Sequence, residues 1–402
     1  MSGRALVIGG SLGGLFAANL LADQGWDVHV FERVGDDLAS RGAGIGTHTA
    51  LVQTLARLGI PMDAELGYES GDRICVDREG RILYRTHWNH VMSAWANVYR
   101  PLKDRFPQDR YHFSKALASF EHDRRGVTAF FEDGTSASGD LLVGADGLRS
   151  AVRGKLFPGV EPQYAGYVAW RSIVDERALP ADARQWLRGG YWFVLPPNEM
   201  FLCYQVPAKG GLAWNYVWYH PVSDAELRAL CTDADGRTHP GGGIPPPLLR
   251  PVFIAEIKRE AKRLLAPQLA TLVDISQPFF QAVFDIESPR LTAGRVALLG
   301  DAAFVARPHI GAGVTKAALD ALCLSNSLNG ATLEDALARY DRLRTEYGRR
   351  CVARARRLGS YIEAKSRPER DWTPEQLDQR PERLLNEVAL ALEEIPELAM
   401  EV

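Results

Sequence analysis

The stretch Gly300-Asp301-Ala302-Ala303, followed within ten residues by Pro308-His309 and Gly311-Ala312-Gly313, decides the fold when it is read with an earlier turn. That turn, Val7-Ile8-Gly9-Gly10-Ser11-Leu12-Gly13-Gly14, lies almost 300 residues before it. An apolar run precedes the early glycines and a helix-like stretch, Leu15 to Leu21, follows them, so we expect a strand, a tight turn and a helix start. A dinucleotide site divided between two such distant segments indicates FAD rather than NAD.

The early turn has the composition of a pyrophosphate site. Glycines let the backbone approach the phosphates, and the free N–H groups of a helix start favour negative charge. Gly9 and Gly14 fit the first and third places of the G-x-G-x-x-G pattern, whereas Ser11 occupies the second, which weakens the pattern. Glu32 ends a second apolar run, at the place from which a carboxylate accepts hydrogen bonds from a ribose diol. The nucleotide-binding residues predicted here are Gly9, Gly10, Ser11, Leu12, Gly14 and Glu32, and an ordinary loop is the alternative.

A third segment, Asp140 to Arg153, predicts an apolar strand that breaks at Asp146-Gly147 and enters a helix capped by Ser150. Asp-Gly by itself indicates only a turn. The order of the three segments, however, resembles the FAD-dependent aromatic hydroxylases with a single flavin-binding domain, the class A flavoprotein monooxygenases. The resemblance covers nearly the whole chain.

This resemblance implies roles for individual residues. Asp146 with Gly147 would contact both FAD and NAD(P)H, and Asp301 would bind the ribityl chain of the flavin. Arg41 matches the family's loop after Glu32, and Arg100 matches its flavin-contacting arginine. Arg33 is a further candidate for phosphate contact, and Pro308 belongs to the loop that the family places beside the isoalloxazine. The chain shows no second G-x-G-x-x-G unit, so NADH or NADPH would bind transiently, and the sequence does not decide between them.

The resemblance also implies an α/β fold: a Rossmann-like FAD-binding domain of the para-hydroxybenzoate hydroxylase type, an inserted antiparallel-sheet substrate domain and C-terminal helices. We assign 1–70, 96–165 and 290–330 to the FAD-binding domain, 71–95 and 166–289 to the substrate-binding sheet, and 331–402 to a C-terminal helical region. Periodicity predicts helices from Lys316 to Leu328 and from Thr332 to Ser360.

Aromatic residues gather between Trp186 and Tyr219, where ten of 34 positions are aromatic and the alternation indicates antiparallel strands. We expect about seven of the ten rings in the sheet core and the remainder around a flat pocket suited to an aromatic substrate. Tyr204 and Tyr216 are the candidates for substrate contact, because each also offers a hydroxyl. Arg171 is conceivable as a partner for a carboxylated phenol, but the sequence does not show which way it points.

Several segments look closest to the hydroxypyridine hydroxylases of the family. They are Arg110-Tyr111-His112, Tyr164-Ala165-Gly166-Tyr167-Val168-Ala169-Trp170-Arg171 and Ala306-Arg307-Pro308-His309. The implied reaction is hydroxylation of a hydroxylated aromatic or pyridine ring with FAD, NAD(P)H and O2 through a flavin C4a-hydroperoxide. The protein would hold the ring, exclude water and polarise its hydroxyl.

His309 is the leading candidate for that last task, since an imidazole titrates near neutral pH and His309 follows Pro308 in the flavin loop. His48 is the second candidate. A purely structural hydrogen-bonding role is the alternative for both. The backbone N–H groups of Gly311, Ala312 and Gly313 open a helix and would stabilise the reduced flavin.

Composition limits the remaining classes. The 402 residues carry a formal net charge of −3, which gives no electrostatic case for nucleic acid. The five cysteines are scattered and the histidines lack ligand spacing, so we expect no disulfides and no catalytic metal. We see neither a signal peptide nor a membrane span and expect a cytoplasmic protein, with homodimerisation possible. The arginine cluster between Arg349 and Arg357 fits a solvated helix face.

Two rival functions remain at this level. One is an FAD-dependent reductase or dehydrogenase on the same scaffold, which motifs alone do not exclude. The other is a non-catalytic FAD-binding redox protein. Oxidation of NAD(P)H stimulated by an aromatic ligand would separate an enzyme from a binder.

Overall fold

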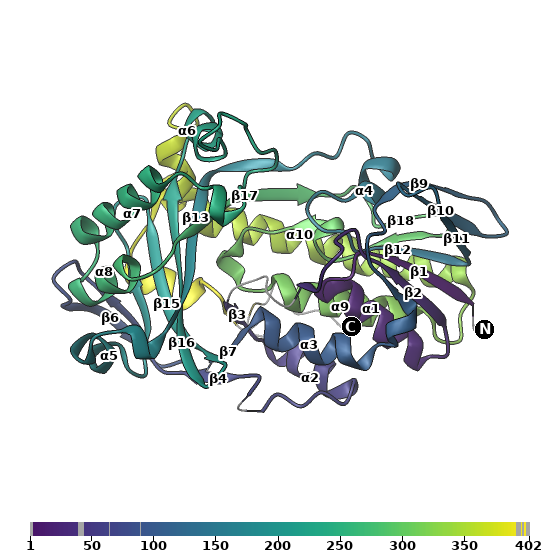
Figure 1. Ribbon diagram of the computed structural model, residues 1–402, viewed down its shortest axis with the longest axis horizontal. Helices are drawn as coiled ribbons and strands as arrows, with labels where there is room; N and C mark the ends of the chain where they lie inside the picture. The colour runs from purple at the N-terminus through teal and green to yellow at the C-terminus, as the bar shows by residue number, and fades with distance from the viewer. Residues whose placement is uncertain are drawn as a thin grey trace.

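The computed structural model describes residues 3–38, 44–63, 65–88, 90–390, 395 and 398. Two lobes lie side by side, one built on a parallel sheet and the other on a larger, mainly antiparallel sheet (Figure 1). The 34-residue helix α10 (Leu333–Ser366) runs along both lobes, in contact with β13, β16 and β17 on one side and with β18 on the other. It therefore joins the two sheets into one body.

The parallel sheet holds the early glycine turn. Its strand order is β18-β19-β12-β1-β2-β8, in which only β18 is antiparallel to its neighbour. The bounds are β1 Arg4–Ile8, β2 Asp27–Phe31, β8 Tyr111–His112, β12 Leu141–Gly144, β18 Thr292–Ala293 and β19 Val296–Leu298. Strand β12 is buried along its whole length and β1 from Ala5 onward, as expected for parallel strands covered on both faces. Helices α1 (Leu12–Asp23) and α9 (Gly313–Leu328) pack against each other beside this sheet.

The larger sheet has the order β20-β17-β13-β16-β15-β14-β5-β6. The bounds are β5 Arg73–Val76, β6 Ile82–Thr86, β13 Gln163–Asp175, β14 Tyr191–Val194, β15 Met200–Ala208, β16 Gly211–Pro221, β17 Phe279–Glu287 and β20 Phe304–Val305. Helices α5 (Ala181–Leu187), α7 (Pro251–Leu264) and α8 (Pro267–Asp274) cover one face of it, which we call the helix face (Figure 1). The opposite face, which we call the cavity face, is turned toward the C-terminal segment and the other lobe.

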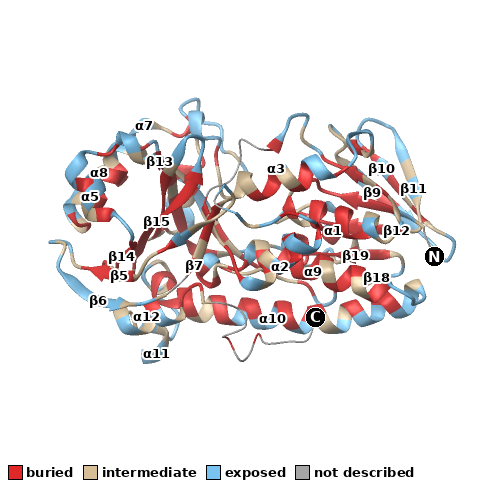
Figure 2. Cartoon of the chain, turned by 90° about the horizontal axis from the view of Figure 1, so that it is seen from below, coloured by how far each residue is buried: buried red, intermediate tan, exposed pale blue. Residues whose placement is uncertain are grey.

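Strand β16 shows how the two faces arise from the sequence. Trp214, Tyr216 and Trp218 belong to the core on the helix face, whereas Val217 and Tyr219 belong to the core on the cavity face. Successive side chains of a strand point to opposite faces, so the alternation places a large ring on the helix face at every second position. In Figure 2, β13 and β15 of the large sheet are mostly buried, whereas much of α7 is exposed.

Two smaller sheets complete the strand structure, with the orders β3-β7-β4 and β11-β10-β9. Their bounds are β3 Gly44–Gly46, β4 Tyr68–Ser70, β7 His90–Ala94, β9 Leu117–His122, β10 Val127–Phe131 and β11 Ser136–Gly139. The first of these sheets combines strands from 1–70 with a strand from 71–95, so it links the two domains proposed from the sequence. The domain boundaries themselves stay a prediction.

The remaining helices are α2 Thr49–Arg57, α3 Trp95–Arg105, α4 Ala151–Leu156, α6 Asp224–Leu230, α11 Pro374–Leu377 and α12 Pro381–Glu387. The two helices expected from periodicity are present as α9 and α10, and α10 continues six residues beyond the expected Ser360. Its buried positions are mainly apolar, as in an amphipathic helix, but they include Arg344, Arg354 and Glu363, so the arginine cluster does not lie entirely on a solvated face. Within the described ranges, no helix has the length and apolarity needed to cross a bilayer.

Candidate active site

The early glycine turn leaves no room for a side chain at Gly9 or at Gly14. Gly9 has φ +104°, and a Cβ there would lie 2.4 Å from the carbonyl oxygen of Ala145. A Cβ on Gly14 would lie 1.9 Å from the carbonyl oxygen of Gly9. Helix α1 begins at Leu12 with no side-chain cap from Ser11 and no acidic residue in its first turn. Its N-terminal N–H groups are therefore suited to an anion such as a pyrophosphate.

Glu32 lies at the carboxyl end of β2, beside this turn. Its carboxylate accepts hydrogen bonds from the backbone N–H groups of Gly10 at 2.8 Å and Val34 at 2.9 Å. The Tyr111 hydroxyl donates to the Gly10 carbonyl at 3.0 Å, and a Cβ on Gly10 would lie 2.0 Å from that hydroxyl oxygen. Gly10 thus fixes the orientation of a carboxylate that could hold a ribose.

Asp146 acts in this structure as a helix cap. Its carboxylate accepts from the Ser150 hydroxyl at 2.5 Å and from the backbone N–H of Ala151 at 2.7 Å. Desolvation raises the pKa of Asp146. Gly147 follows with φ +77°, a conformation that favours glycine. The contact with FAD and NAD(P)H that the resemblance implies for Asp146 and Gly147 stays a prediction.

Asp301 lies above a buried charge network that the sequence analysis did not single out. Lys316 Nζ donates to the Gly300 carbonyl at 2.8 Å and lies 3.3 Å from Asp320 Oδ2. Asp320 also accepts from the Gly300 N–H at 2.9 Å and from Arg344 Nε at 2.7 Å. The network holds the Gly300-Asp301 turn against α9 and α10. A lysine and an aspartate four residues apart in an otherwise apolar helix were the signal for it.

The Asp301 side chain remains open to solvent at the wall of a cavity, although surrounding protein atoms desolvate it. This desolvation raises the pKa of the carboxyl, while the nearby Lys316 lowers it. Asp301 is the acidic residue among those that line the cavity. It could accept hydrogen bonds from the hydroxyls of a ribityl chain.

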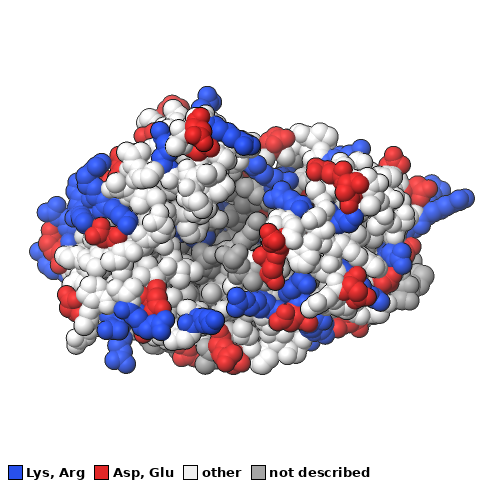
Figure 3. Space-filling view, in the orientation of Figure 1, with Lys and Arg blue, Asp and Glu red and all other residues white. Residues whose placement is uncertain are grey.

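The cavity, of about 590 Å³, lies between the two lobes, where Figure 3 shows a central hollow. One wall is the start of α9 with the preceding loop, and the opposite wall is the cavity face of the large sheet. The lining residues include Arg171, Tyr191, Tyr204, Tyr219, Asp301, Arg307, Pro308, Gly311, Ala312, Gly313, Val388 and Ala389. Segments from all parts of the chain therefore meet here.

The α9 end of the cavity is open to a ligand. Gly311 has φ +62°, and a Cβ on Gly313 would meet no atom within 4 Å. Helix α9 has no side-chain cap and no acidic residue in its first turn. Its N–H groups and the positive end of its dipole could therefore face a ring system that carries negative charge.

His309 does not line the cavity. It is 1% exposed, and its Nε2 lies 2.7 Å from the Tyr167 hydroxyl. Burial, together with the positive charge of Arg307, lowers the pKa of His309 to about 3, so the ring is neutral near pH 7. Its ring centroid lies 4.5 Å from that of Tyr219, which does line the cavity. His309 therefore supports the wall, and direct proton transfer to a substrate has no geometric basis here.

His48 is likewise turned away from the cavity. Its Nδ1 lies 2.8 Å from the Thr315 hydroxyl and its Nε2 lies 3.1 Å from the Leu390 carbonyl oxygen. Since both ring nitrogens are engaged, His48 ties α9 to the C-terminal segment. This is the structural alternative that the sequence left open for both histidines.

Tyr204 and Tyr216 lie on opposite faces of the large sheet. Tyr204 lines the cavity, whereas the Tyr216 hydroxyl lies 2.8 Å from the Ser276 hydroxyl within the helix-face core. Tyr216 pairs with Cys203 across the β15–β16 ladder, one position away from Tyr204. A shift of one residue reverses the face, which explains why only one of the two can reach a ligand.

Tyr191 and Tyr219 also line the cavity, and neither was singled out from the sequence. Burial raises the pKa of Tyr191 to about 12 and raises the pKa of Tyr204 and Tyr219 as well. All three phenols are therefore neutral near pH 7 and could donate or accept hydrogen bonds. Three of the ten aromatic residues in the aromatic stretch reach the cavity.

Of the remaining candidates for cofactor contact, only Pro308 is found among the described residues that line the cavity. Arg33 and Arg100 are exposed. Arg41 lies outside the described residues. Pro308 lines the cavity beside Arg307. Arg307 is held by Asp285 at 2.9 Å and Glu363 at 2.8 Å, all three side chains being 4% exposed.

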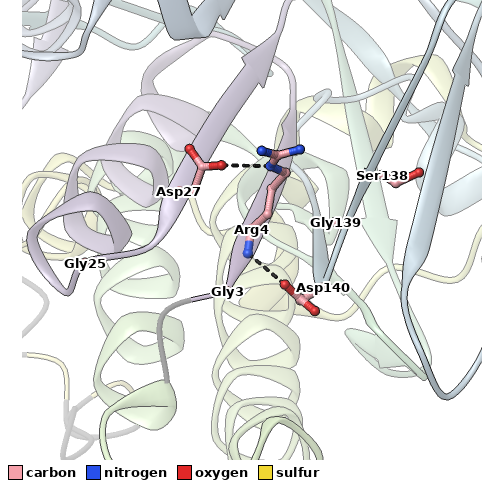
Figure 4. A pocket seen from close by; sticks show the side chains of 7 residues that line it. All are labelled: Gly3, Arg4, Gly25, Asp27, Ser138, Gly139 and Asp140. Carbon is pink, nitrogen blue, oxygen red and sulfur yellow. Dashed lines mark hydrogen bonds and ion pairs between the residues drawn. The ribbon is translucent and has the colours of Figure 1, made fainter.

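A second hollow, of about 520 Å³, lies at the amino ends of β1 and β2 (Figure 4). Arg4 Nε pairs there with Asp27 at 2.7 Å, and the Arg4 N–H donates to Asp140 at 2.8 Å. Ligands of parallel α/β sheets bind at the carboxyl ends of the strands, which is the opposite end. We therefore place the active site in the cavity between the lobes. In the described part of the chain, no group of three metal-ligating side chains is assembled.

The residues present fit FAD. The glycine turn before α1 could hold the pyrophosphate and Glu32 the ribose, while Asp301 could hold the ribityl chain and Gly311 to Gly313 the isoalloxazine. The glycine cradles that a Cβ would fill and the two uncapped helix starts carry this fit.

Comparison with known proteins shows the family of the chain. A family model described as FAD binding domain-like matches residues 164–285. The chain is 30% identical to 2,6-dihydroxypyridine 3-monooxygenase of Paenarthrobacter nicotinovorans, over 90% of this chain and 91% of that protein. It is 31% identical to the FAD-dependent urate hydroxylase of Klebsiella pneumoniae, over 95% and 97%. The chain belongs to the family of FAD-dependent aromatic monooxygenases.

Solved structures show the same architecture. The structure of 2,6-dihydroxypyridine-3-hydroxylase from Arthrobacter nicotinovorans superimposes with a TM-score of 0.86 at 29% identity, covering 93% of this chain and 95% of that one. Klebsiella pneumoniae HpxO complexed with FAD and uric acid gives a TM-score of 0.77 at 26% identity, covering 95% of each chain. The α/β fold with C-terminal helices, the FAD dependence and the monooxygenase class expected from the sequence are thus confirmed.

Proposed function

We propose that this protein hydroxylates a small, hydroxylated N-heteroaromatic ring of the hydroxypyridine type, with NADH or NADPH and dioxygen as co-substrates. The cavity between the lobes carries the proposal, since three tyrosines face it opposite the uncapped start of α9. Similarity to 2,6-dihydroxypyridine 3-monooxygenase over nine-tenths of the chain supports the same substrate class. Bound FAD supplies the activation of dioxygen.

The side chains of the cavity would bind and orient the ring. Tyr191, Tyr204 and Tyr219 offer flat apolar surface together with hydroxyls, which is the combination that recognises a polar aromatic ring. Because their pKa values are raised, these hydroxyls would act as hydrogen-bond partners and would not remove a proton from the substrate as phenolates. The ring's own hydroxyl would be polarised by such contacts.

The protein would also exclude water from the reacting ring. Val388 and Ala389 line the cavity from the C-terminal side. The Ala389 N–H donates to the carbonyl of His309 at 2.8 Å, so the C-terminal segment is attached to the loop before α9. A closed wall at this place would suppress the wasteful release of hydrogen peroxide.

The test is oxidation of NADH and of NADPH by the FAD-loaded protein across a panel of hydroxypyridines and phenols, with peroxide and hydroxylated product measured together. We expect a hydroxypyridine to accelerate oxidation and to be hydroxylated. Acceleration that yields only peroxide with every ring compound would contradict the proposal and favour a reductase. Comparison of the two oxidation rates shows whether NADH or NADPH serves as the co-substrate.

The same proposal includes a cytoplasmic location, no nucleic-acid or membrane partner, and a possible homodimer. The modest formal charge of −3 supports the absence of nucleic-acid and membrane partners, since nucleic acids and anionic membranes attract basic surfaces. Light scattering of the FAD-loaded protein across a range of concentrations would show whether it dimerises.

A further inference from the structure

Arg171 lines the cavity and forms no ion pair with a carboxylate of the described residues. Arg171 lies on β13, where it pairs with Val217 of β16 and Phe279 of β17, and its side chain lies on the cavity face. The sequence did not show the direction of the Arg171 side chain, and in the structure this side chain points toward the candidate substrate site.

The hydrogen bonds of Arg171 are few and neutral. Nη1 donates to Gln281 Oε1 at 2.9 Å, and Nη2 donates to the Gly44 carbonyl at 3.2 Å. The buried Nε has no hydrogen-bond partner among the described residues. A guanidinium carries five N–H donors, so more than half of them are left for another partner.

The neighbouring charges do not compensate it. Arg307, the other arginine at the cavity, is paired with Asp285 and Glu363 and is therefore neutralised. The positive charge of Arg171 acts on Tyr204 and Tyr219, lowering the pKa of each, yet burial keeps both phenols neutral. Among the described residues, the cavity thus presents a cation that has no ion pair, beside two neutral hydroxyls.

A partly buried charge without a partner is costly, and a ligand that supplies the opposite charge removes that cost. The planar fork of a guanidinium also matches two acceptor oxygens, or one delocalised oxyanion, better than a neutral carbonyl. The hydrogen bonds that Arg171 donates to the Gln281 amide and to the Gly44 carbonyl have neutral acceptors, so each is weaker than a hydrogen bond to an anion.

We propose that Arg171 binds an anionic oxygen of the aromatic substrate, so that the enzyme selects rings that carry a carboxylate or an ionised ring hydroxyl. This inference rests on the proposed function, because it concerns the ligand of the same cavity. Arg171 then determines both the charge of the accepted substrate and the edge of the ring that points away from α9.

The test uses the FAD-loaded protein and follows ligand binding by the change in flavin absorbance, without turnover. The probes are 4-hydroxybenzoate and 4-hydroxybenzamide, which differ in charge but hardly in shape, and 2,6-dihydroxypyridine titrated across its own ionisation. A carboxylate partner predicts that 4-hydroxybenzoate binds more tightly than the amide. A ring oxyanion predicts that the affinity of the pyridine rises as the pyridine loses its proton.

Arg171→Gln should weaken binding of the anionic probe by about 10- to 100-fold, as expected for loss of a charge-assisted contact, and that of the neutral amide by less than about threefold. Arg171→Lys should give an intermediate loss. Gln281→Glu places a carboxylate beside the intact arginine and should abolish the preference for the anion. Arg177→Gln, at an exposed position paired with Asp175, is the matched control.

Two outcomes would distinguish failure of the inference about Arg171 from failure of the proposed function. If anionic and neutral probes bind equally and Arg171→Gln affects them equally, the inference about charge is wrong while the aromatic site stands. If no ring compound of either charge perturbs the flavin, the proposed function is wrong and the inference falls with it. Because Gln281→Glu retains every residue of the arginine's strand, a folding defect in Arg171→Gln would not remove the test.

Discussion

The Nε2 atom of His309 and the hydroxyl oxygen of Tyr167 lie 2.7 Å apart in a place that solvent does not reach. The pair connects the loop before α9 with β13, so it joins the two walls of the cavity behind the residues that line it. A histidine expected to exchange protons with a substrate is instead a support of the site.

We therefore predict that His309 sets a pH dependence of stability and none of catalysis. Its folded pKa, lowered to about 3, lies below the ordinary value of 6.5, so between these values the unfolded chain binds more protons than the folded one. The stability that His309 contributes is complete above pH 6.5 and declines as the pH falls toward 3. His309→Gln should make thermal unfolding less sensitive to pH in this window.

The control for His309 is the pH profile of kcat. It should keep its shape in His309→Gln, because a ring that stays neutral from pH 5 to 9 cannot produce an inflection there. A bell-shaped profile that loses one limb in the variant would restore His309 as an acid–base residue.

A matched pair of tyrosine substitutions separates ligand contact from packing. Tyr204→Phe removes a hydroxyl from the cavity wall and should raise KM or the peroxide yield with little change in stability. Tyr216→Phe removes the contact with Ser276 and should lower the free energy of unfolding by about 1 kcal/mol while KM stays unchanged. Steady-state kinetics and urea unfolding on both variants measure the split, and equal effects on KM would contradict the opposite placement.

Glu32 should matter for FAD and for little else. Glu32→Gln retains the shape but removes the charge that would meet a ribose diol, so we predict about a tenfold rise in the Kd of FAD. Fluorescence of FAD released from and rebound to the apoprotein gives the value. Glu121→Gln, on the exposed side of β9, is the control and should bind FAD as the parent does. Unchanged FAD affinity in Glu32→Gln would place the ribose elsewhere.

Arg73 should control how tightly the C-terminal segment closes the cavity. This fully buried arginine donates to the carbonyl oxygens of Leu385 at 2.8 Å, Val388 at 2.6 Å and Ala389 at 2.9 Å. Arg73→Met leaves these carbonyls without that donor, at a cost of about 1–3 kcal/mol, and loosens the wall formed by Val388 and Ala389.

The expected consequence for Arg73→Met is a higher ratio of peroxide to hydroxylated product, by about twofold or more, because water reaches the site. Arg380→Met, at the exposed start of α12, tests whether any loss of an arginine near this helix has that effect. The two variants should differ in peroxide yield at equal NAD(P)H consumption. A normal yield in Arg73→Met would show that the segment does not seal the cavity.

Local patterns in the sequence were sufficient for the parts of the site that local backbone geometry creates. The Ser150 cap of α4 accepts from the backbone N–H of Arg153, three residues further on, and Glu32 directly follows the second strand. Spacing also singled out Gly9 and Gly14, although the atoms that exclude a Cβ at Gly9 belong to Ala145, far away in the sequence. The helices α9 and α10 were predictable for the same reason.

The cavity side chains were not predictable in this way, since their direction depends on cross-strand register. Tyr204 and Tyr216 have the same chemistry, and only the pairing of Cys203 with Tyr216 shows that they face opposite sides. The sequence could not show that His309 and His48 lie outside the cavity lining, because their partners come from segments 142 and 267 or more residues away. The role of Arg73 depends on hydrogen bonds to the C-terminal segment, which no sequence motif predicts.

The alternation along β16 divides this strand into two sets of positions that act on different properties of the protein. Changes at Val217 and Tyr219 alter what the cavity accepts, whereas changes at Trp214, Tyr216 and Trp218 alter how firmly the strand is held to α5, α7 and α8. Substitutions at the odd-numbered positions should therefore change which ring the cavity accepts, while the contacts that hold the strand to the helices stay in place. Directed evolution of this enzyme would begin with a library confined to those positions.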